Sequence, residues 1–298
     1  MSRFFCFIIN YIYRFDFLRE NRQASNIIMK HSKKGEFYGQ TNKTILLDGI
    51  TLTDTVYTHP KVDWHYHEHA YFTFILQGNV IEGNKKEVYN CGPGSLLFHN
   101  WQEAHYNIKP EGFTRGFHLE IEKQWFDDLT MTSNNLQGST SVLNPDIKLL
   151  MYKIFRATKI DDIHSDLSTQ TLLIEILSKL NGDAQSIFHK NPKWVLMIDE
   201  ILHDQFTETI TLDYLSKIVN IHPIHLSRDF SKYFHCNLGE YIRKLKVEKA
   251  LSLISLPNKS LTEIAYECGF FDQSHLTRSF REINGLNPSE HKKLLFKK

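Results

Sequence analysis

The 298-residue chain lacks several features that would assign it to common classes of protein. Its four cysteines lie far apart without a C-x-x-C pair, which excludes a disulfide-stapled miniprotein and predicts reduced, mostly buried thiols in a cytosolic protein. Net charge is nearly absent as well. Lys and Arg total 35 against 34 Asp and Glu, so the overall charge of +1 does not indicate a nucleic-acid or membrane partner.

No apolar segment is long enough to cross a membrane. The most apolar run near the start, residues 4–13, is far shorter than the roughly 20 residues that a membrane-spanning helix needs. Arg14 and Asp16 close this run, and no A-x-A cleavage site follows. We therefore treat residues 1–30 as an uncertain N-terminal extension, in which Met29 is an alternative start, and we expect a soluble cytoplasmic protein without a membrane partner.

The common catalytic signatures are missing too. The patterns G-x-x-x-x-G-K-[ST], G-x-S-x-G and H-E-x-x-H do not occur in the sequence. The glycine-rich stretch Gly92-Pro93-Gly94 is typical of a turn and not of a phosphate loop. Nothing in the sequence therefore supports nucleophilic catalysis.

Alternation of apolar and polar residues predicts a β-rich domain over residues 31–140. Between Lys43 and Glu122, short runs with a period of two are separated by glycine and proline. The strand candidates are rich in aromatic and branched residues and comprise residues 45–49, 71–76, 95–98 and 117–121. Many short strands at this spacing are typical of a sandwich or barrel.

Helical periodicity takes over after about Asn144. Leu and Ile recur at three- and four-residue spacing over residues 149–155 and 172–180, and Asn181-Gly182-Asp183 is expected to end the second helix. Asn191-Pro192 is expected to start another helix. The predicted fold class is multi-domain α+β: a β-barrel at 31–140, a helical linker or dimerisation segment at 141–190, and an all-α domain at 191–298.

Charge separates along the same line. Residues 31–140 carry nine basic and thirteen acidic side chains, whereas residues 217–298 carry fourteen basic and eight acidic ones. The net charges of −4 and +6 show that the balanced total conceals a basic C-terminal domain. Such a domain favours a polyanionic partner.

An internal repeat lies within this basic domain. Residues 211–216 match residues 260–265, and residues 225–230 match residues 275–280. Each unit predicts a short helix, a turn and a second helix, which is the plan of the DNA-binding helix-turn-helix. Residues 238–254, between the units, predict one long helix of about 25 Å, enough to hold two reading helices in successive major grooves.

The second helix of each unit has an apolar face and a polar face. Leu226 and Phe230 in the first unit, like Leu276 and Phe280 in the second, form the apolar stripe. The predicted DNA-binding residues occupy the other face and are Ile224, Ser227, Arg228, Ser231, Gln273, Ser274, Thr277, Arg278 and Arg281. Arginine and glutamine make bidentate contacts to guanine and adenine, respectively. The alternative, two hairpins that merely pack a bundle, is disfavoured by the matched His-Leu-[Ser/Thr]-Arg-x-Phe segments.

A long motif runs through the second unit: Ile264-Ala265-x-x-x-Gly269-Phe270-x-x-x-Ser274-x-Leu276-x-Arg278-x-Phe280-Arg281-x-x-x-Gly285-x-x-Pro288. This motif, within residues 192–298, resembles the signature of AraC/XylS-type transcription regulators. The resemblance implies two helix-turn-helix units joined by a long helix and base-reading positions among the DNA-binding residues named above. It also implies activation through contact with RNA polymerase.

Seven of the 16 histidines fall within sixty residues, at positions 59, 65, 67, 69, 99, 105 and 118. Alternate strand residues face the same way, so His65 and His67 are expected to present two imidazoles to one cavity, and His105 could complete a face for a metal. Residues 64–68 and 94–98 resemble the two motifs of the cupin barrel, which AraC-like regulators often carry. Metal-binding cupins have a glutamate where this chain has Tyr71.

Three imidazoles without a carboxylate form an incomplete metal site. We therefore expect His65, His67, Tyr71 and His105 to bind a small effector of unknown identity, and we expect no metal and no cofactor. The predicted function is a non-enzymatic transcription regulator that binds double-stranded DNA in two adjacent major grooves. The alternative is a metal-dependent cupin enzyme or a metal sensor fused to a helical module, and a homodimer is left open.

Overall fold

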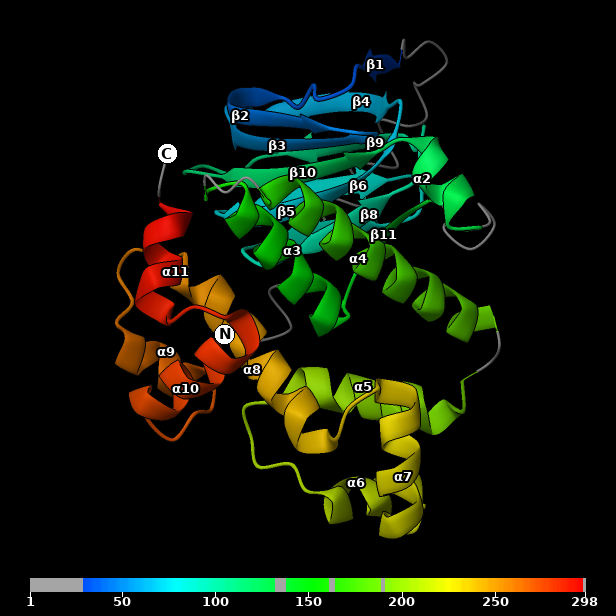
Figure 1. The fold of residues 1–298 in the computed structure, drawn as a ribbon, viewed down its shortest axis with the longest axis vertical. Coiled ribbons are helices and arrows are strands. Elements are labelled where there is room, and N and C mark those ends of the chain that lie inside the picture. The colour runs from blue at the N-terminus through cyan, green and yellow to red at the C-terminus, as the bar shows by residue number, and fades with distance from the viewer. Residues whose placement is uncertain (1–28, 132–137, 161–163, 189–190, 297–298) are drawn as a thin grey trace.

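The computed structural model describes residues 29–131, 138–160, 164–188 and 191–296. Residues 1–28 of the expected N-terminal extension therefore lie outside the described residues. A β-rich domain, a pair of helices and a helical domain follow one another along the chain (Figure 1). None of the helices in these ranges combines the length and apolar character that a membrane-spanning segment needs.

The β-rich domain consists of two sheets. The five-stranded sheet has the order β1 (Lys30–Ser32), β4 (Lys61–His67), β9 (His105–Ile108), β6 (Val80–Asn84) and β7 (Val88–Cys91). The six-stranded sheet has the order β11 (Ser139–Ser141), β8 (Leu96–His99), β5 (Ala70–Gln77), β10 (Arg115–Ile121), β3 (Ile50–Tyr57) and β2 (Gly39–Leu47). Apart from the β1–β4 pair, which is parallel, the pairings are antiparallel, and the predicted barrel of short strands is confirmed.

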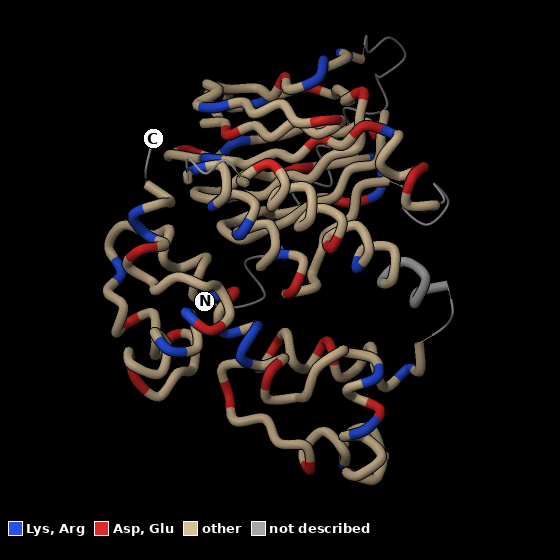
Figure 2. The backbone as a smooth tube through the Cα atoms, in the orientation of Figure 1, with Lys and Arg blue, Asp and Glu red and all other residues tan. Residues whose placement is uncertain are grey.

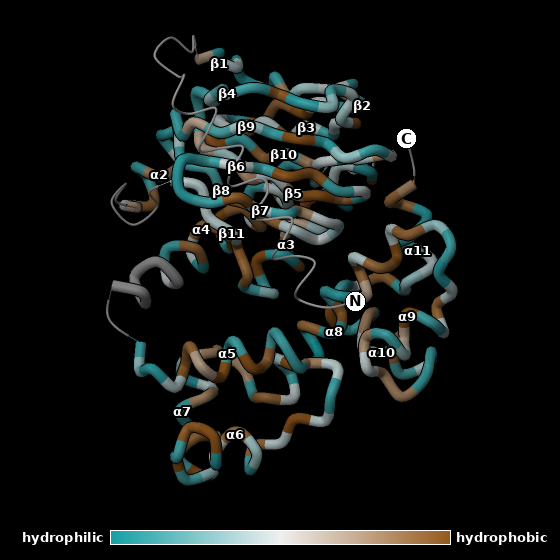
Figure 3. Tube along the Cα trace, turned by 180° about the vertical axis from the view of Figure 1, so that it is seen from behind, coloured by the Kyte–Doolittle hydropathy of each residue, from teal (hydrophilic) through white to brown (hydrophobic). Residues whose placement is uncertain are grey.

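The two faces of the six-stranded sheet differ in chemistry. Leu52, Leu119 and Phe72 pair across β3, β10 and β5, and all three are buried on the face that packs against helices. The next residues along these strands, such as His118 and Thr73, face the other sheet. Figure 3 shows the resulting mixture of hydrophobic and hydrophilic residues along the strands. The apolar core of this domain therefore lies outside the barrel, and the barrel interior is polar.

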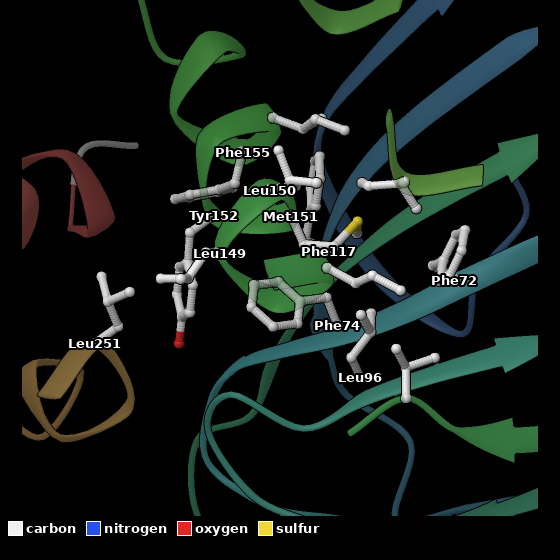
Figure 4. Packing of buried hydrophobic residues seen from close by; sticks show 14 of the residues in the cluster. Phe72, Phe74, Leu96, Phe117, Leu149, Leu150, Met151, Tyr152, Phe155 and Leu251 are labelled. Atoms are coloured by element: carbon white, nitrogen blue, oxygen red, sulfur yellow. The ribbon is translucent and has the colours of Figure 1, made fainter. Parts of the chain in front are cut away.

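Two helices cover the apolar face, after the short α2 (Lys123–Asp128). They are α3 (Pro145–Ala157) and α4 (Ser165–Phe188), and α3 begins at an Asn144 cap that accepts the Asp146 N–H. Figure 4 shows Phe74 and Phe117 of the sheet beside Tyr152 and Phe155 of α3, with Leu251 of α8 (Leu238–Ile254) nearby.

One predicted helix end is wrong. The helix does not stop at Asn181-Gly182-Asp183, because α4 continues through these residues to Phe188. A helical glycine costs only about 1 kcal/mol relative to alanine. Burial of residues such as Leu173, Ile176 and Leu177 on the preceding turns offsets that cost.

The C-terminal domain is helical, as expected. Its elements are α5 (Lys193–Gln205), α6 (Leu212–Val219), α7 (Pro223–Phe234), α8 (Leu238–Ile254), α9 (Leu261–Glu267), α10 (Gln273–Asn284) and α11 (Pro288–Leu295). The long helix predicted between the two units is α8. In the turn after α9, Gly269 has a φ of +71°, and a Cβ there would lie 2.3 Å from the Thr207 carbonyl oxygen, so only glycine fits.

The two helix-turn-helix units belong to different hydrophobic cores. The first unit forms its own core with α5 and the first half of α8, around Leu202, Leu215 and Phe230. The second unit, with Ile264 and Phe280, belongs to the same core as the six-stranded sheet and α3. The second unit is thus joined to the barrel through α3, whereas the first is held by α8 (Figure 1).

A buried ionic cluster lies where the barrel meets the helices. The carboxylate of Asp54 on β3 accepts two hydrogen bonds from Arg115, at 2.7 and 2.6 Å, and a third from Lys159 at 2.7 Å. Burial alone would raise the pKa of Asp54, but the hydrogen bonds from the two cations lower it overall. Arg115 also donates to the Leu295 carbonyl of α11 at 2.6 Å, which links the cluster to the C-terminal helices.

Removal of the central carboxylate tests this cluster. We expect Asp54→Ala to lower the free energy of unfolding by about 3–5 kcal/mol, because two buried cations lose their partner. Asp127→Ala is the matched control, since the Lys123–Asp127 pair is exposed, and such pairs contribute about 0–1 kcal/mol. Urea denaturation measures both, and equal losses for the two variants would contradict the assigned role of Asp54.

Candidate functional site: barrel interior and reading helices

Helix α7 presents the predicted reading residues of the first unit. Proline at the first helical position and the His222 cap, which accepts the Ile224 N–H, set the start of the helix. Leu226 and Phe230 are buried, as predicted from the stripe. The four predicted DNA-binding residues of this helix, Ile224, Ser227, Arg228 and Ser231, are all exposed.

Helix α10 presents the corresponding residues of the second unit. Asp272 caps this helix by accepting the His275 N–H, and Leu276 and Phe280 are buried. Gln273, Ser274, Arg278 and Arg281 are exposed, and Thr277 is half-buried. Together with Glu282, which sequence reasoning missed, these five residues line an open groove of about 540 Å³.

Local contacts orient two of the reading side chains. The hydroxyl of Thr262 on α9 donates to Gln273 Oε1 at 2.9 Å, which leaves the amide NH₂ of Gln273 as a free donor. Arg228 Nε donates to Asp229 Oδ1 at 3.0 Å, which ties the guanidinium to the neighbouring carboxylate. Figure 2 shows basic and acidic residues interspersed over these helices, so the basic excess is not confined to one segment.

The barrel interior brings together the four predicted effector residues. His65 and His105 pair across β4 and β9, and His67 is two residues along β4. One nitrogen from each of the three imidazoles lies within 4.8 Å of the others, and Tyr71 Oη is 2.9 Å from His105 Nε2. All four side chains are buried. They border a small cavity of about 20 Å³, which is room for a single water molecule or ion.

The segment before β2 covers this cavity. Strand β1 pairs with β4 at the histidines themselves, with Lys30 opposite His65 and Ser32 opposite His67. Phe37 stacks on the His118 ring at a centroid distance of 3.6 Å and lies 4.9 Å from the His67 ring. The N-terminal part of the described chain therefore covers the histidine cluster.

Backbone carbonyls fix the tautomers of two histidines. His65 Nδ1 lies 2.9 Å from the Asp63 carbonyl oxygen, and His105 Nδ1 lies 3.1 Å from the Glu103 carbonyl oxygen. A carbonyl can only accept, so each Nδ1 must carry the proton. Both Nε2 atoms therefore keep a lone pair, and that of His105 accepts the Tyr71 hydroxyl.

Burial keeps the imidazoles neutral. It lowers the pKa of His65 to about 4 and the pKa values of His99 and His118 to about 3, and it lowers those of His67 and His105 well below the usual value.

Glu82 was not predicted from the sequence and faces the same interior. Burial raises the pKa of its carboxyl to about 8, and its Oε1 lies 3.0 Å from His99 Nε2. His99 Nδ1 lies 2.9 Å from the Ser139 hydroxyl, whereas Glu82 Oε1 and His99 Nε2 are buried without a hydrogen-bond partner among the described residues. The alternation of Glu82 with apolar neighbours on a half-buried strand was the available signal.

Many polar atoms in the barrel have no hydrogen-bond partner among the described residues. They include the Thr51, Thr53 and Thr55 hydroxyls together with His67 Nδ1 and Glu120 Oε1. Buried polar groups without partners are rare in folded proteins and call for an explanation. Their concentration in one interior suits a site that receives a polar ligand.

The neutral histidines make stability depend on pH. Each has a lower pKa in the folded chain than its unfolded value of about 6.5, so acidification below that pH protonates only the unfolded state. Each such histidine reduces the free energy of unfolding by about 1.4 kcal/mol per pH unit between pH 6.5 and 4.5. Glu82 and Glu120, whose pKa values are raised to about 8 and about 7, act in the opposite direction but are outnumbered.

We therefore expect stability to fall between pH 6.5 and 4.5, and we expect the fall to be shallower by one histidine's contribution in His118→Gln. Urea denaturation at several pH values measures the slope. His59→Gln, at an exposed position, should retain the parental slope. Parallel slopes for the parent and His118→Gln would contradict the buried neutral state of His118.

Two family models match consecutive parts of the chain. An AraC-like ligand binding domain matches residues 49–177, which contain most of the barrel together with α3 and the first half of α4. A helix-turn-helix domain matches residues 215–293, which contain α7, α8 and α10.

Named relatives are transcriptional regulators. The chain is 33% identical over 92 residues to the HTH-type transcriptional regulator GbdR of Pseudomonas aeruginosa, covering 31% of this chain and 25% of that protein. It is 30% identical over 105 residues to the uncharacterized regulator YpdC of Escherichia coli, covering 35% and 34%. The chain thus spans about a quarter and about a third of the length of these two relatives. YdeC of Bacillus subtilis is 23% identical over 253 residues, covering 77% and 86%.

A solved structure of ToxT from Vibrio cholerae covers 83% of this chain and 99% of its own, at 14% identity and a TM-score of 0.36. That score is too low for the likeness to bear on function. The two matched domains and the named regulators give no support to the alternative of a cupin enzyme. In both of its matched domains the chain is similar to AraC-type regulators: a barrel that matches an AraC-like ligand binding domain lies ahead of two helix-turn-helix units.

Proposed function

We propose that α7 and α10 read two adjacent major grooves of a promoter and that occupancy of the barrel by an effector controls this binding. The observation that carries the proposal is the continuous core between the barrel, α3 and the second helix-turn-helix unit. A ligand that alters the barrel has a packed route to α10, because cores of this density transmit strain.

Polar contacts reinforce the route at the ends of the reading unit. Arg156 of α3 donates from Nη1 to the carbonyl of Asn284, the last residue of α10, at 2.6 Å. Gln77 at the end of β5 lies 3.3 Å from the Ser255 carbonyl, just after α8. The C-terminal end of α10 is therefore held by α3, and the residue that follows α8 is held by the barrel.

The first unit is held differently. Its core is separate, and its links to α3 are ionic contacts through α8, such as Lys244 with Asp146 at 3.0 Å. An effector changes an equilibrium only if it binds two states unequally. We infer that the two states differ in the placement of α7 relative to α10, since α10 shares a core with α3 and the barrel and α7 does not.

The proposal has three further parts: activation of transcription, a cytoplasmic location and dimerisation. Activation through RNA polymerase and a cytoplasmic location follow from family likeness. A homodimer through α4 is supported by Leu167 and Ile174, which lie seven residues apart on one face of the helix and are exposed.

Selection of sheared genomic DNA tests the reading surface. We expect the full chain to enrich a two-box motif whose centres are about 10 bp apart, and Arg228→Ala/Arg278→Ala to lose it. Each single substitution should weaken specific binding by about 1–3 kcal/mol and relax the preference at one base pair. Lys85→Ala, on an exposed turn of the barrel, is the control. Unchanged sequence preference in the double variant would show that the reading face is wrongly assigned.

Sedimentation velocity tests the dimer. If α4 pairs two chains, Leu167→Glu/Ile174→Glu should sediment as a monomer at concentrations where the parent is a dimer, because buried glutamates repel and lose their hydration. Leu196→Glu, at an exposed apolar position on α5, should leave the parental state intact. A monomeric parent would rule out this pairing.

A further inference from the structure

We propose that the barrel binds a divalent transition-metal ion, Zn²⁺ in preference to others, through His65, His67 and His105. This deepens the proposed function by naming the class of ligand, and it rests on that function only for the claim that the occupied barrel controls DNA binding. It differs from the expectation drawn from the sequence, which took the missing carboxylate as decisive.

The geometry of the three imidazoles is the first argument. They come from adjacent strands, they are no more than 2% exposed, and one nitrogen from each lies within 4.8 Å of the other two. Nitrogen ligands of tetrahedral zinc lie about 2.0–2.1 Å from the ion and hence about 3.4 Å from one another. Ring rotations that move each nitrogen by about 1 Å therefore close the site.

The hydrogen bonds of the outer ring nitrogens are the second argument. His65 and His105 each donate Nδ1–H to the backbone carbonyl two residues earlier. Metal-binding histidines characteristically donate their other ring N–H to a carbonyl or carboxylate, which fixes the tautomer and the ring orientation. His67, in the same cluster, has a buried Nδ1 without a partner among the described residues.

The size of the cavity is the third argument. Organic ligands occupy pockets of about 300–1,000 Å³. The space bordered by the three histidines has about 20 Å³, which suits one ion or one water molecule. In this conformation the barrel therefore accepts an ion and not an organic effector of ordinary size.

The donor set selects the metal. Three neutral nitrogens without a carboxylate suit Zn²⁺, whereas Mg²⁺, Ca²⁺ and Mn²⁺ prefer oxygen ligands, and non-haem Fe²⁺ sites combine two histidines with a carboxylate. Glu82 does not complete such a triad, because the described ligand atoms that lie within 4.8 Å of one another come from His65, His67 and His105 and not from Glu82.

Tyr71 supplies the neighbouring polar group. Its hydroxyl is 2.9 Å from His105 Nε2, the atom whose lone pair the ion would use. Binding of the ion would therefore replace this hydrogen bond and free the Tyr71 hydroxyl, which borders the same cavity.

Cobalt spectroscopy on the full chain tests the site. The protein is prepared without a histidine tag, stripped with EDTA and titrated with Co²⁺, which gives strong visible bands in a tetrahedral site. We expect one equivalent of Co²⁺ to produce these bands and Zn²⁺ to abolish them, and we expect Zn²⁺ to raise the Tm of the stripped protein. No bands and no rise in Tm in the parent would overturn the proposal, whatever the variants do.

Matched variants locate the ion. His67→Gln and His105→Gln should each weaken Zn²⁺ binding by at least about 100-fold, since loss of even an outer partner of a ligand costs about 10–100-fold. His69→Gln, two residues beyond His67 and outside the cavity, should bind like the parent. Circular dichroism of the stripped variants checks their fold. Parental affinity in both ligand variants would overturn the assignment of these residues.

The two proposals can fail separately. Stoichiometric Zn²⁺ binding by a protein that enriches no DNA motif would refute the proposed regulation and leave the metal site standing. Enrichment of a motif by a protein that binds no metal would refute the metal site alone. A motif enriched equally with and without Zn²⁺ would show that the ion does not act as the effector.

Discussion

The packing of α3 between the six-stranded sheet and the second helix-turn-helix unit is the interaction on which the rest of the structure depends. Tyr152 of this helix contacts Phe74 of the sheet on one side and His291 of α11 on the other. Arg156, one turn further along, holds the carbonyl at the end of α10. Without α3 the barrel would expose its apolar face, and the second reading helix would have no fixed position relative to it. The barrel, α3 and the second helix-turn-helix unit therefore share one hydrophobic core. The first unit has a separate core and is attached through α8.

The polar interior of the barrel follows from the same arrangement. A small sandwich ordinarily fills the space between its sheets with apolar side chains. Here the outer face of one sheet is covered by helices, so the apolar core forms there, and the space between the sheets is free to hold histidines, threonines and glutamates. Among the described residues, the apolar cluster that lies between the sheets is a minor one around Ile75 and Val80. The domain thereby gains stability from a surface that is not used for binding, which leaves the interior available for ligand chemistry.

How far the sequence could predict this structure depends on the range of each signal. The repeat, the helix caps and the long α8 are local patterns, and the residues of the reading face follow directly from helical periodicity. The pairing of His65 with His67 was also local, because it needs only strand alternation. Glu82, His99 and the covering Phe37 were missed, since their place depends on strand order and on a β1–β4 pairing that no local pattern encodes. The persistence of α4 beyond Gly182 was missed for a similar reason: burial of distant residues outweighs a weak local preference.

The hydrogen bond from Arg115 to the Leu295 carbonyl joins residues 180 positions apart, and that from Gln77 to Ser255 joins residues 178 apart. Contacts of such long sequence separation form late in folding, because the chain must first close a very large loop. During synthesis on the ribosome, the barrel emerges long before α11. Until α11 is made, the apolar core beside the barrel lacks the C-terminal helices, and Arg115 lacks the Leu295 carbonyl. The nascent barrel is therefore the stage at which this protein is most exposed to aggregation, and completion of the second reading unit is also the step that finishes the sensor.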